Sequence, residues 1–276
     1  MQVVNDQEPG VGRGPDYQVQ ALVRGLEVLQ LVAAEPETSL SEVARKLQLS
    51  VSQAFRLLAT LEAQGYVSKR PGKRYVAGPA ALVLGHWAVA GHPLRQLAAA
   101  VLDRLADQTR ESVHLVVREG LSTVIADVRE SPQAVQVVSP LGKRGALHVG
   151  ASGKLFLAFE SPSLLEKVLA APLERFAPST TLEPGALRAE LRRVAEQGVC
   201  LAIDDFEPGA YAIGAPIFAA GKRILAALAV AGPVSRLTSE AAARYTSLVR
   251  AAAGQLSAAL GGDDGREAIQ RDVKFT

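Results

Sequence analysis

The sequence has 276 residues, of which 48% are hydrophobic, 5% aromatic and 21% charged, and its formal net charge is +2. At about 150 residues per domain, this length predicts two domains, and the apolar content excludes a chain that is disordered throughout. The single cysteine, Cys200, excludes a disulfide scaffold and a multi-cysteine metal site, and it is typical of a reducing compartment. We therefore expect a globular, cytoplasmic protein.

The first residues are not typical of a targeting segment. Residues 1–16 are polar and rich in Gly and Pro, so we expect a disordered tail and no signal peptide. Residues 75–94 contain no charged side chain over about the length of a membrane-spanning helix. Glycines, prolines and histidines interrupt this stretch, which favours a turn and one buried helix. No membrane association is predicted.

Two capping patterns mark a pair of short helices in residues 39–63. Ser39 with Glu42, and Ser50 with Gln53, have the spacing of reciprocal helix caps. Residues 48–50 form a three-residue turn between the helices. Helix, tight turn and helix is the layout in which a second helix can enter the major groove of DNA.

The second helix has an apolar inner face and a different outer face, at 100° per residue. The inner face consists of apolar side chains, namely Ala54, Leu57, Leu58 and Leu61. Ser52 and Arg56 lie on the outer face, which a groove wall or a phosphate can approach closely. Phe55, on a flank, either contacts a thymine methyl group or packs on the neighbouring helix.

A basic β-hairpin with its turn at residues 71 and 72 is predicted to follow this helix. Between residues 17 and 78 eight cations outnumber five acids, so positive charge is clustered around the turn. Such a wing can lie along the phosphate backbone. We predict that this unit binds double-stranded DNA, rather than another protein, which is the alternative. The predicted DNA-binding residues are Ser41, Ser50, Ser52, Gln53, Phe55, Arg56, Lys69, Arg70, Lys73 and Arg74.

The hydrophobic periodicity predicts an α+β protein with a small helical domain, a connecting helix and a larger α+β domain. We expect a DNA-binding domain at 17–79, a linker helix at 80–93, a second domain at 94–260 and a polar tail at 261–276. The helical pattern that begins at residue 80 extends to about 108. Strands are predicted at 112–118, 122–128, 133–138, 199–203, 211–218 and 223–231, and helices at 153–159, 163–170, 186–197 and 239–260. The last helix either packs on the sheet or mediates self-association.

No catalytic or metal motif has the required spacing. In residues 148–155, His148 stands where a phosphate-binding loop needs its first glycine, and Leu155 stands where it needs Ser or Thr. The four histidines lack paired ligand spacing, and His114 is expected to be a buried, satisfied side chain. We therefore predict no enzymatic activity, no cofactor and no metal. The same segment either holds a carboxylate on free N–H groups at a helix start, or forms a plain turn with Ser152 as the cap.

Several segments in order make the sequence resemble the isocitrate lyase regulator (IclR) family over residues 18–260. They are LSEVA at 40–44, LS at 49–50, RLLATLEAQGYV at 56–67, LHVGASGK at 147–154, DDFE at 204–207, API at 215–217 and AGP at 231–233. The resemblance implies a winged helix-turn-helix regulator whose GAF-like C-terminal domain, with an antiparallel sheet, binds a small effector. It also implies a homodimer or homotetramer.

By the same resemblance, effector contacts map onto six positions, which are Ala151, Ser152, Asp204, Ala212, Ala229 and Ala231. Asp204 can equally be a solvated strand end. Relatives that bind small polar keto acids tend to have Cys or Ser at the last three positions, where this sequence has alanine. We therefore expect a less polar, roomier pocket and an effector with a carboxylate or polar end and an apolar or aromatic body.

The predicted function is sequence-specific regulation of transcription, with repression favoured over activation. A symmetric dimer is expected to bind a pseudo-palindromic operator. The helix at 80–108 is expected to transmit effector binding to the DNA-binding domain.

Overall fold

The computed structural model describes residues 18–91 and 93–262, which divide into two compact units at residues 92 and 93. The tail predicted at 1–16, and residues 263–276 of the second predicted tail, lie outside the described residues. The boundaries predicted at 17–79, 80–93 and 94–260 stay predictions. None of the helices in the described ranges is long and apolar enough to cross a membrane.

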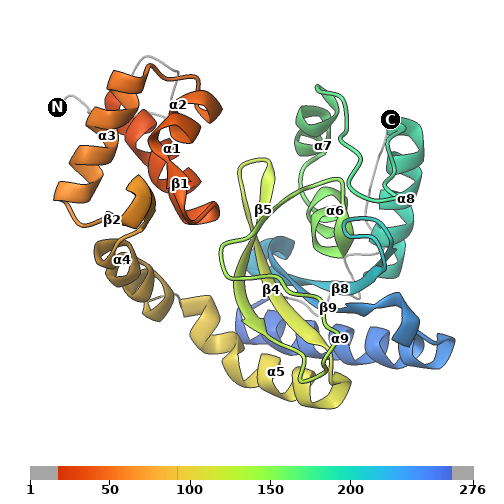
Figure 1. Ribbon diagram of the computed structural model, residues 1–276. Coiled ribbons are helices and arrows are strands. Elements are labelled where there is room, and N and C mark those ends of the chain that lie inside the picture. The colour runs from red at the N-terminus through yellow and green to blue at the C-terminus, as the bar shows by residue number, and fades with distance from the viewer. Residues whose placement is uncertain (1–17, 92, 263–276) are drawn as a thin grey trace, which may run out of the picture. The chain divides into compact units, whose positions relative to one another are not determined.

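The first unit places short helices around a small antiparallel sheet (Figure 1). Its elements are α1 (Gln20–Ala34), β1 (Thr38–Ser39), α2 (Leu40–Lys46), α3 (Val51–Ala63), β2 (Val67–Arg70), the short η2 turn (Pro71–Lys73), β3 (Arg74–Ala77) and α4 (Pro79–Ala90). Strand β3 lies between β1 and β2 and pairs with both. Val32 of α1, Val43 of α2, Leu58 of α3 and Tyr75 of β3 meet in one buried core.

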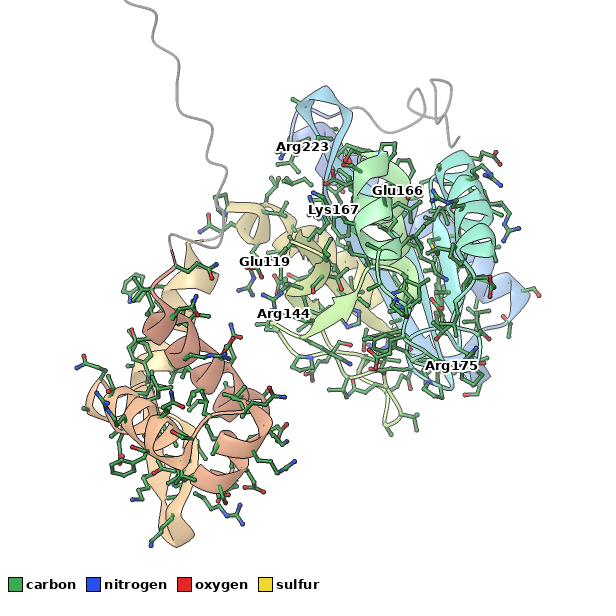
Figure 2. The ribbon with its side chains drawn as sticks, turned by 90° about the horizontal axis from the view of Figure 1, so that it is seen from above. Glu119, Arg144, Glu166, Lys167, Arg175 and Arg223 are labelled. Atoms are coloured by element: carbon green, nitrogen blue, oxygen red, sulfur yellow. The ribbon has the colours of Figure 1, made fainter. Side chains whose placement is uncertain are left out.

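The second unit is a six-stranded sheet with helices on both faces (Figure 1). Its elements are α5 (Pro93–Thr109), β4 (Ser112–Glu119), β5 (Ser122–Arg129), β6 (Arg144–Ala146), α6 (Gly150–Phe159), α7 (Pro162–Leu169), α8 (Pro184–Gln197), β7 (Cys200–Ile203), β8 (Ala210–Ala219), β9 (Arg223–Pro233) and α9 (Ser239–Ala259). The strand order is β6-β5-β4-β9-β8-β7, and every neighbouring pair is antiparallel. At one edge, Arg144 of β6 forms an ion pair with Glu119 of β4 (Figure 2).

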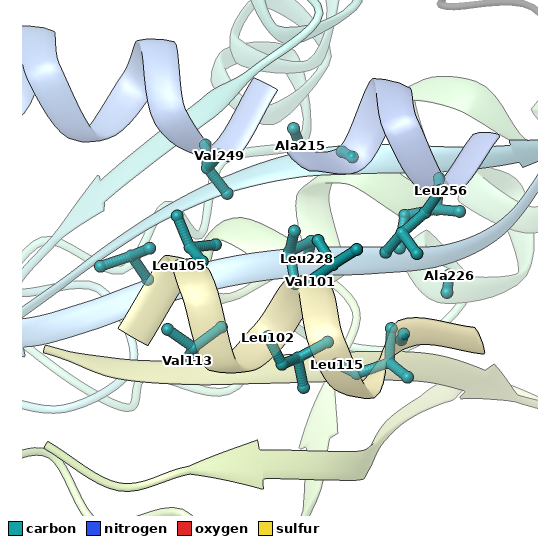
Figure 3. Close-up of a cluster of buried hydrophobic side chains, with 14 of the residues drawn as sticks. Val101, Leu102, Leu105, Val113, Leu115, Ala215, Ala226, Leu228, Val249 and Leu256 are labelled. Atoms are coloured by element: carbon teal, nitrogen blue, oxygen red, sulfur yellow. The ribbon is translucent and has the colours of Figure 1, made fainter. Parts of the chain in front are cut away.

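Each face of this sheet has its own core. On one face α5 and α9 bury Leu102, Leu105, Val249 and Leu256 against strands β4, β8 and β9 (Figure 3). On the other face α6, α7 and α8 bury a second apolar cluster that includes Leu155. Helix α9 therefore packs on the sheet, the first of the two alternatives given for it. The predicted winged helix-turn-helix and the α+β class with an antiparallel sheet are confirmed.

The single helix predicted from residue 80 to 108 was wrong. Helix α4 ends at Ala90, and α5 begins at Pro93, whose missing N–H is tolerated only at a helix start. The helix expected to be buried is also largely exposed, since Leu82, Leu84 and Trp87 of α4 are exposed large hydrophobic residues.

The strand predicted at 133–138 was wrong as well, because this segment is a loop. Its carbonyl groups accept hydrogen bonds from side chains rather than from a neighbouring strand: Ser112 Oγ donates to Val137 O at 2.9 Å, and Arg236 Nη1 donates to Val135 O at 2.9 Å. The strand β6 was not predicted. It pairs with β5 through only three residues, too few to show alternation.

Candidate functional site

The helix-turn-helix is fixed by the two predicted capping boxes. The carboxylate of Glu42 accepts the backbone N–H of Ser39 at 2.7 Å, and the Ser39 hydroxyl accepts the N–H of Glu42 at 3.3 Å. At the start of α3, Ser50 N–H donates to Gln53 Oε1 at 3.0 Å, and Gln53 N–H donates to Ser50 Oγ at 3.1 Å. Both helices therefore begin at defined residues, which sets the orientation of the outer face of α3.

The outer face of α3 is exposed, as its periodicity predicts. Ser52, Phe55 and Arg56 are exposed, whereas Ala54 and Leu58 are buried in the core. Phe55 is 53% exposed and outside the buried core of the unit, and its two alternatives, contact with DNA or packing on the neighbouring helix, stay predictions. An exposed aromatic side chain beside a cation is suited to contact with the edge of a base pair.

The hairpin of β2 and β3, the wing, has four cations, of which three are exposed and the fourth contacts other residues of the same unit. Strands β2 and β3 pair from Val67 with Ala77 to Arg70 with Arg74, and Gly72 at φ 76° closes the turn. Lys69, Arg70 and Lys73 are exposed.

Arg74 instead ties the wing to α2. Its Nη1 donates to Glu42 Oε2 at 2.9 Å and to the carbonyl of Glu37 at 3.1 Å. Hydrogen bonds from the side chain and backbone of Ser39 lower the pKa of Glu42, and the charge of Arg74 lowers it further. Ser41, the last of the predicted DNA-binding residues, is exposed on α2, with its hydroxyl 3.1 Å from that of Ser39.

In the second unit, a cavity of about 110 Å³ lies between the sheet and the start of α6. Five of the six predicted effector positions line it, namely Ala151, Ser152, Ala212, Ala229 and Ala231. Its other walls include apolar side chains such as Val116, Ile125 and Phe206. The structure therefore brings residues from β8, β9 and α6 together around one largely apolar space.

Asp204 is the exception: it is absent from the residues that line the cavity and directly follows β7, which favours the second of its two alternatives, a strand end. Its carboxylate accepts the N–H of Gly209 at 2.5 Å and its N–H donates to Ala210 O at 2.9 Å, so it shapes the turn between β7 and β8. The next residue, Asp205, lines the cavity instead. The sequence offered no signal that would have separated these adjacent carboxylates.

Helix α6 begins three residues earlier than predicted, so Ser152 is not its cap. The helix runs from Gly150, with Val149 as the capping residue, and the N–H of Gly150 donates to Asp205 Oδ2 at 2.6 Å. Ala151 and Ser152 follow in the first turn, where N–H groups have no acceptor within the helix. Both residues line the cavity.

A buried lysine lies between Asp205 and a second carboxylate. Lys154 Nζ lies 3.0 Å from Asp205 Oδ2 and 2.6 Å from Glu190 Oε1, and its side chain is almost fully buried. Burial alone would lower the pKa of Lys154, but the nearby carboxylates outweigh burial and raise it. Lys154 therefore stays charged, and it partly offsets the negative charge of Asp205 at the start of α6.

His114 also lines the cavity, from strand β4. Its side chain is 4% exposed, and Nε2 makes no hydrogen bond to any residue that the structure describes. Burial lowers the pKa of His114 to about 4, with a smaller contribution from Lys143, so the ring is neutral at pH 7. The expectation that His114 is buried holds, but the expectation that it is satisfied does not.

No catalytic or metal-binding arrangement accompanies the cavity. Among residues 18–91 and 93–262, no three His, Cys, Asp or Glu side chains are grouped so as to hold a metal ion. Burial raises the pKa of Cys200 to about 12, so this thiol is not a nucleophile at neutral pH.

Two family models match the chain. One, described as the IclR helix-turn-helix domain, matches residues 21–71, and the other, described as the C-terminal domain of the bacterial transcriptional regulator IclR, matches residues 86–258. Among curated proteins, the transcriptional regulator BhcR of Paracoccus denitrificans is 30% identical over 90% of both chains. The transcriptional repressor AllR of Salmonella typhi is 30% identical over 92% of this chain and 93% of its own length.

Solved structures have the same fold. A regulator from Alicyclobacillus acidocaldarius superposes with a TM-score of 0.80 at 26% identity, covering 88% of this chain and 99% of its own. An IclR homologue from Microbacterium hydrocarbonoxydans, crystallised with 4-hydroxybenzoate, superposes with a TM-score of 0.74 at 26% identity, covering 87% and 99%.

Proposed function

This chain belongs to the IclR family of bacterial transcriptional regulators, and we propose that it is a repressor whose affinity for DNA changes when it binds an aromatic or largely apolar carboxylate. As a member of this family it is a DNA-binding regulator with an effector-binding C-terminal domain, and not an enzyme. The composition of the cavity is the observation that carries the proposed effector class. Because its target is DNA, we place the protein in the cytoplasm.

The outer face of α3 is the proposed base-reading surface. Arg56 and Phe55 are exposed there, and the cations Lys69, Arg70 and Lys73 are exposed on the wing of the same unit. The arginine fork can pair with the edge of a guanine, and the wing cations can pair with phosphates. Arg74 is left out of the proposed contact set, since its guanidinium is occupied by Glu42.

Measurement of operator binding by fluorescence anisotropy tests this surface. Arg56→Ala is expected to weaken binding to a duplex from the protein's own upstream region by about 1–3 kcal/mol, if the side chain reads a base. Arg223→Ala, which removes an exposed cation from the second unit (Figure 2), is the matched control and should leave affinity unchanged. Equal binding by the parent and Arg56→Ala would show that α3 is not the reading helix.

The assembly is proposed to be a symmetric homodimer, or a tetramer built from such dimers. A twofold axis would present two copies of α3 to half-sites about one helical turn, or a multiple of one turn, apart. Nuclease footprinting with light scattering on the complex checks this. A single half-site occupied by one protomer would refute it.

The effector is proposed to bind with its carboxylate at the first turn of α6 and its body against the alanines of β8 and β9. The N–H groups of Ala151 and Ser152 and the positive end of the helix dipole favour an anion. Ala212, Ala229 and Ala231 leave room without offering a polar partner, which suits an apolar body. The relative crystallised with 4-hydroxybenzoate supports the same ligand class.

Calorimetry with two sets of acids tests the ligand class. Benzoate, 4-hydroxybenzoate and phenylacetate are expected to bind more tightly than glyoxylate and pyruvate. Ala229→Leu should abolish binding because the added methyl groups enter the cavity, whereas Ala243→Leu, at an exposed position of α9, should not. Tight binding of glyoxylate alone would contradict the proposal.

A further inference from the structure

His114 has a buried nitrogen that no described residue satisfies. Its ring is 4% exposed, it lines the cavity, and Nε2 has no hydrogen-bond partner among the residues described. A buried polar atom without a partner costs free energy, and most such atoms in native proteins are paired with protein, water or ligand. Nε2 itself is covered, but His114 lines the cavity, so a ligand bound there can supply the missing partner once the ring turns toward it.

The strand register places His114 across the cavity floor from the start of α6. His114 of β4 lies opposite Ala229 of β9, and Ala229 lies opposite Gly214 of β8. Helix α6 packs directly on Gly214, since a Cβ built there would lie 3.3 Å from the Cβ of Ala151. Adjacent strands are about 4.8 Å apart, so two strand spacings put the backbones of His114 and Gly214, the residue beneath α6, about 10 Å apart.

This separation and the small residue between the two ends suit an elongated, flat ligand. Ala229 is the residue between them, and its methyl group leaves space over the sheet. A single aromatic ring with polar groups at opposite ends spans such a distance once a hydrogen bond is added at each end.

The protonation state of His114 determines which polar group of a ligand can bind beside it. Burial, and secondarily the charge of Lys143, hold the pKa of His114 at about 4, so the imidazole is neutral at pH 7. Lys143 forms an ion pair with Glu207 and lies 5.3 Å from the ring centroid of Phe206, so its charge is already compensated. A second carboxylate at this end would be buried without a counter-charge, whereas a neutral hydroxyl carries no such cost.

We propose that His114 Nε2 hydrogen-bonds a hydroxyl group of the effector at the end opposite its carboxylate, and so selects hydroxylated over unsubstituted aromatic acids. The inference rests on the proposed function, in which an aromatic carboxylate is the effector. His114 is then a specificity-determining residue, with α6 holding the carboxylate and Nε2 reading the far end of the ring.

Calorimetry with the matched probes 4-hydroxybenzoate and benzoate tests this. The parent protein is expected to bind 4-hydroxybenzoate about tenfold more tightly, the value of one net hydrogen bond. His114→Phe keeps an aromatic ring, of somewhat larger volume, but removes Nε2, so the ratio should fall to about one. Val116→Ala is the control, because it lies on the same strand, lines the same cavity and should weaken both acids alike.

A second measurement needs only the parent protein. The ring ¹⁵N resonance of His114 Nε2 should shift when 4-hydroxybenzoate is added and stay nearly in place with benzoate. This measurement decides the matter if His114→Phe does not fold.

The possible failures are distinct. Equal binding of the two acids by the parent, or an unchanged ratio in His114→Phe, overturns the role of His114 and leaves the ligand class standing. Loss of the ratio in Asp205→Asn but not in His114→Phe also overturns it, because Asp205 Oδ1 is a further unpartnered buried atom of a residue that lines the cavity. If neither acid binds, the proposed ligand class is wrong and the role of His114 is rejected with it.

Discussion

The four wing cations should not contribute equally to DNA binding, because one of them is committed to the fold. Lys73 is exposed at the hairpin turn, whereas the guanidinium of Arg74 donates to Glu42 and to the carbonyl of Glu37. Removal of each charge with a side chain of similar length, Lys73→Gln and Arg74→Gln, therefore separates a phosphate contact from a structural ion pair.

The expected magnitude follows from counterion release. Each phosphate contact contributes about −0.9 to the slope of log K against log salt, so Lys73→Gln should flatten the slope by about 0.9 per DNA-bound protomer. Between 50 and 200 mM salt, one contact changes the fall in affinity by about three- to fourfold. Arg74→Gln should leave the slope nearly unchanged and instead lower the melting temperature, since it frees the wing from α2.

Fluorescence anisotropy with a labelled duplex over this salt range measures both slopes, and circular dichroism measures both melting temperatures. The control is Arg223→Gln, an exposed charge in the second unit that should change neither the slope nor the affinity. An equal flattening of the slope by Lys73→Gln and Arg74→Gln would refute the reasoning, because the ion pair with Glu42 would then not hold Arg74 away from phosphate.

Three further predictions concern stability. Lys154→Met should lower the free energy of unfolding in urea by about 3–5 kcal/mol, because it leaves the buried Asp205 without its counter-charge. The pKa of His114 is about 4 in the folded protein against 6.5 ordinarily, so the unfolded state binds the proton first as pH falls. The free energy of unfolding should therefore drop by up to about 3 kcal/mol between pH 6.5 and 4. His114→Phe should remove this contribution to the pH dependence. Gly78→Ala should cost about 1–3 kcal/mol in thermal unfolding, because its Cβ would lie 2.2 Å from a backbone oxygen; Gly85→Ala, with open space around it, should not destabilise the protein.

The parts of the fold that the sequence predicted well have strong local signals. The two capping boxes located the starts of α2 and α3 to the residue, because Ser39 and Ser50 satisfy backbone N–H groups at fixed spacing. The long strands β4, β5, β8 and β9 were also located, since their Val, Ile and Ala runs exceed the length of a turn. In these segments local preference and the final packing agree.

The errors fall where local pattern and tertiary partners disagree. The Val-containing segment at 133–138 has strand composition, yet its carbonyl groups are taken by Ser112 and Arg236 from distant elements. Leu82, Leu84 and Trp87 of the apolar helix α4 are exposed, and periodicity cannot show whether an apolar face has a partner within the chain. Such outcomes depend on contacts far apart in sequence, which no window of a few residues contains.

The candidate site was predicted by position more successfully than by chemistry. Five alanine and serine positions do line one cavity, but Asp204 turned out to shape a loop while Asp205 reaches the cavity. The free Nε2 of His114 could not be foreseen, because the alternation of strand β4 indicates which face a side chain lies on and not whether its polar atom finds a partner.

Lys154 is expected to affect both the stability of the second unit and the charge at the start of α6. Asp205 accepts a hydrogen bond from the first N–H of α6, that of Gly150. The helix start by itself would attract a ligand carboxylate, and the negative charge of Asp205 opposes that attraction. Lys154 offsets that charge at 3.0 Å, and its burial strengthens the ion pair by excluding water. In the proposed function, the ligand carboxylate binds at the remaining N–H groups of Ala151 and Ser152. If the proposed effector binds there, Lys154→Met should therefore weaken its binding as well as destabilise the domain.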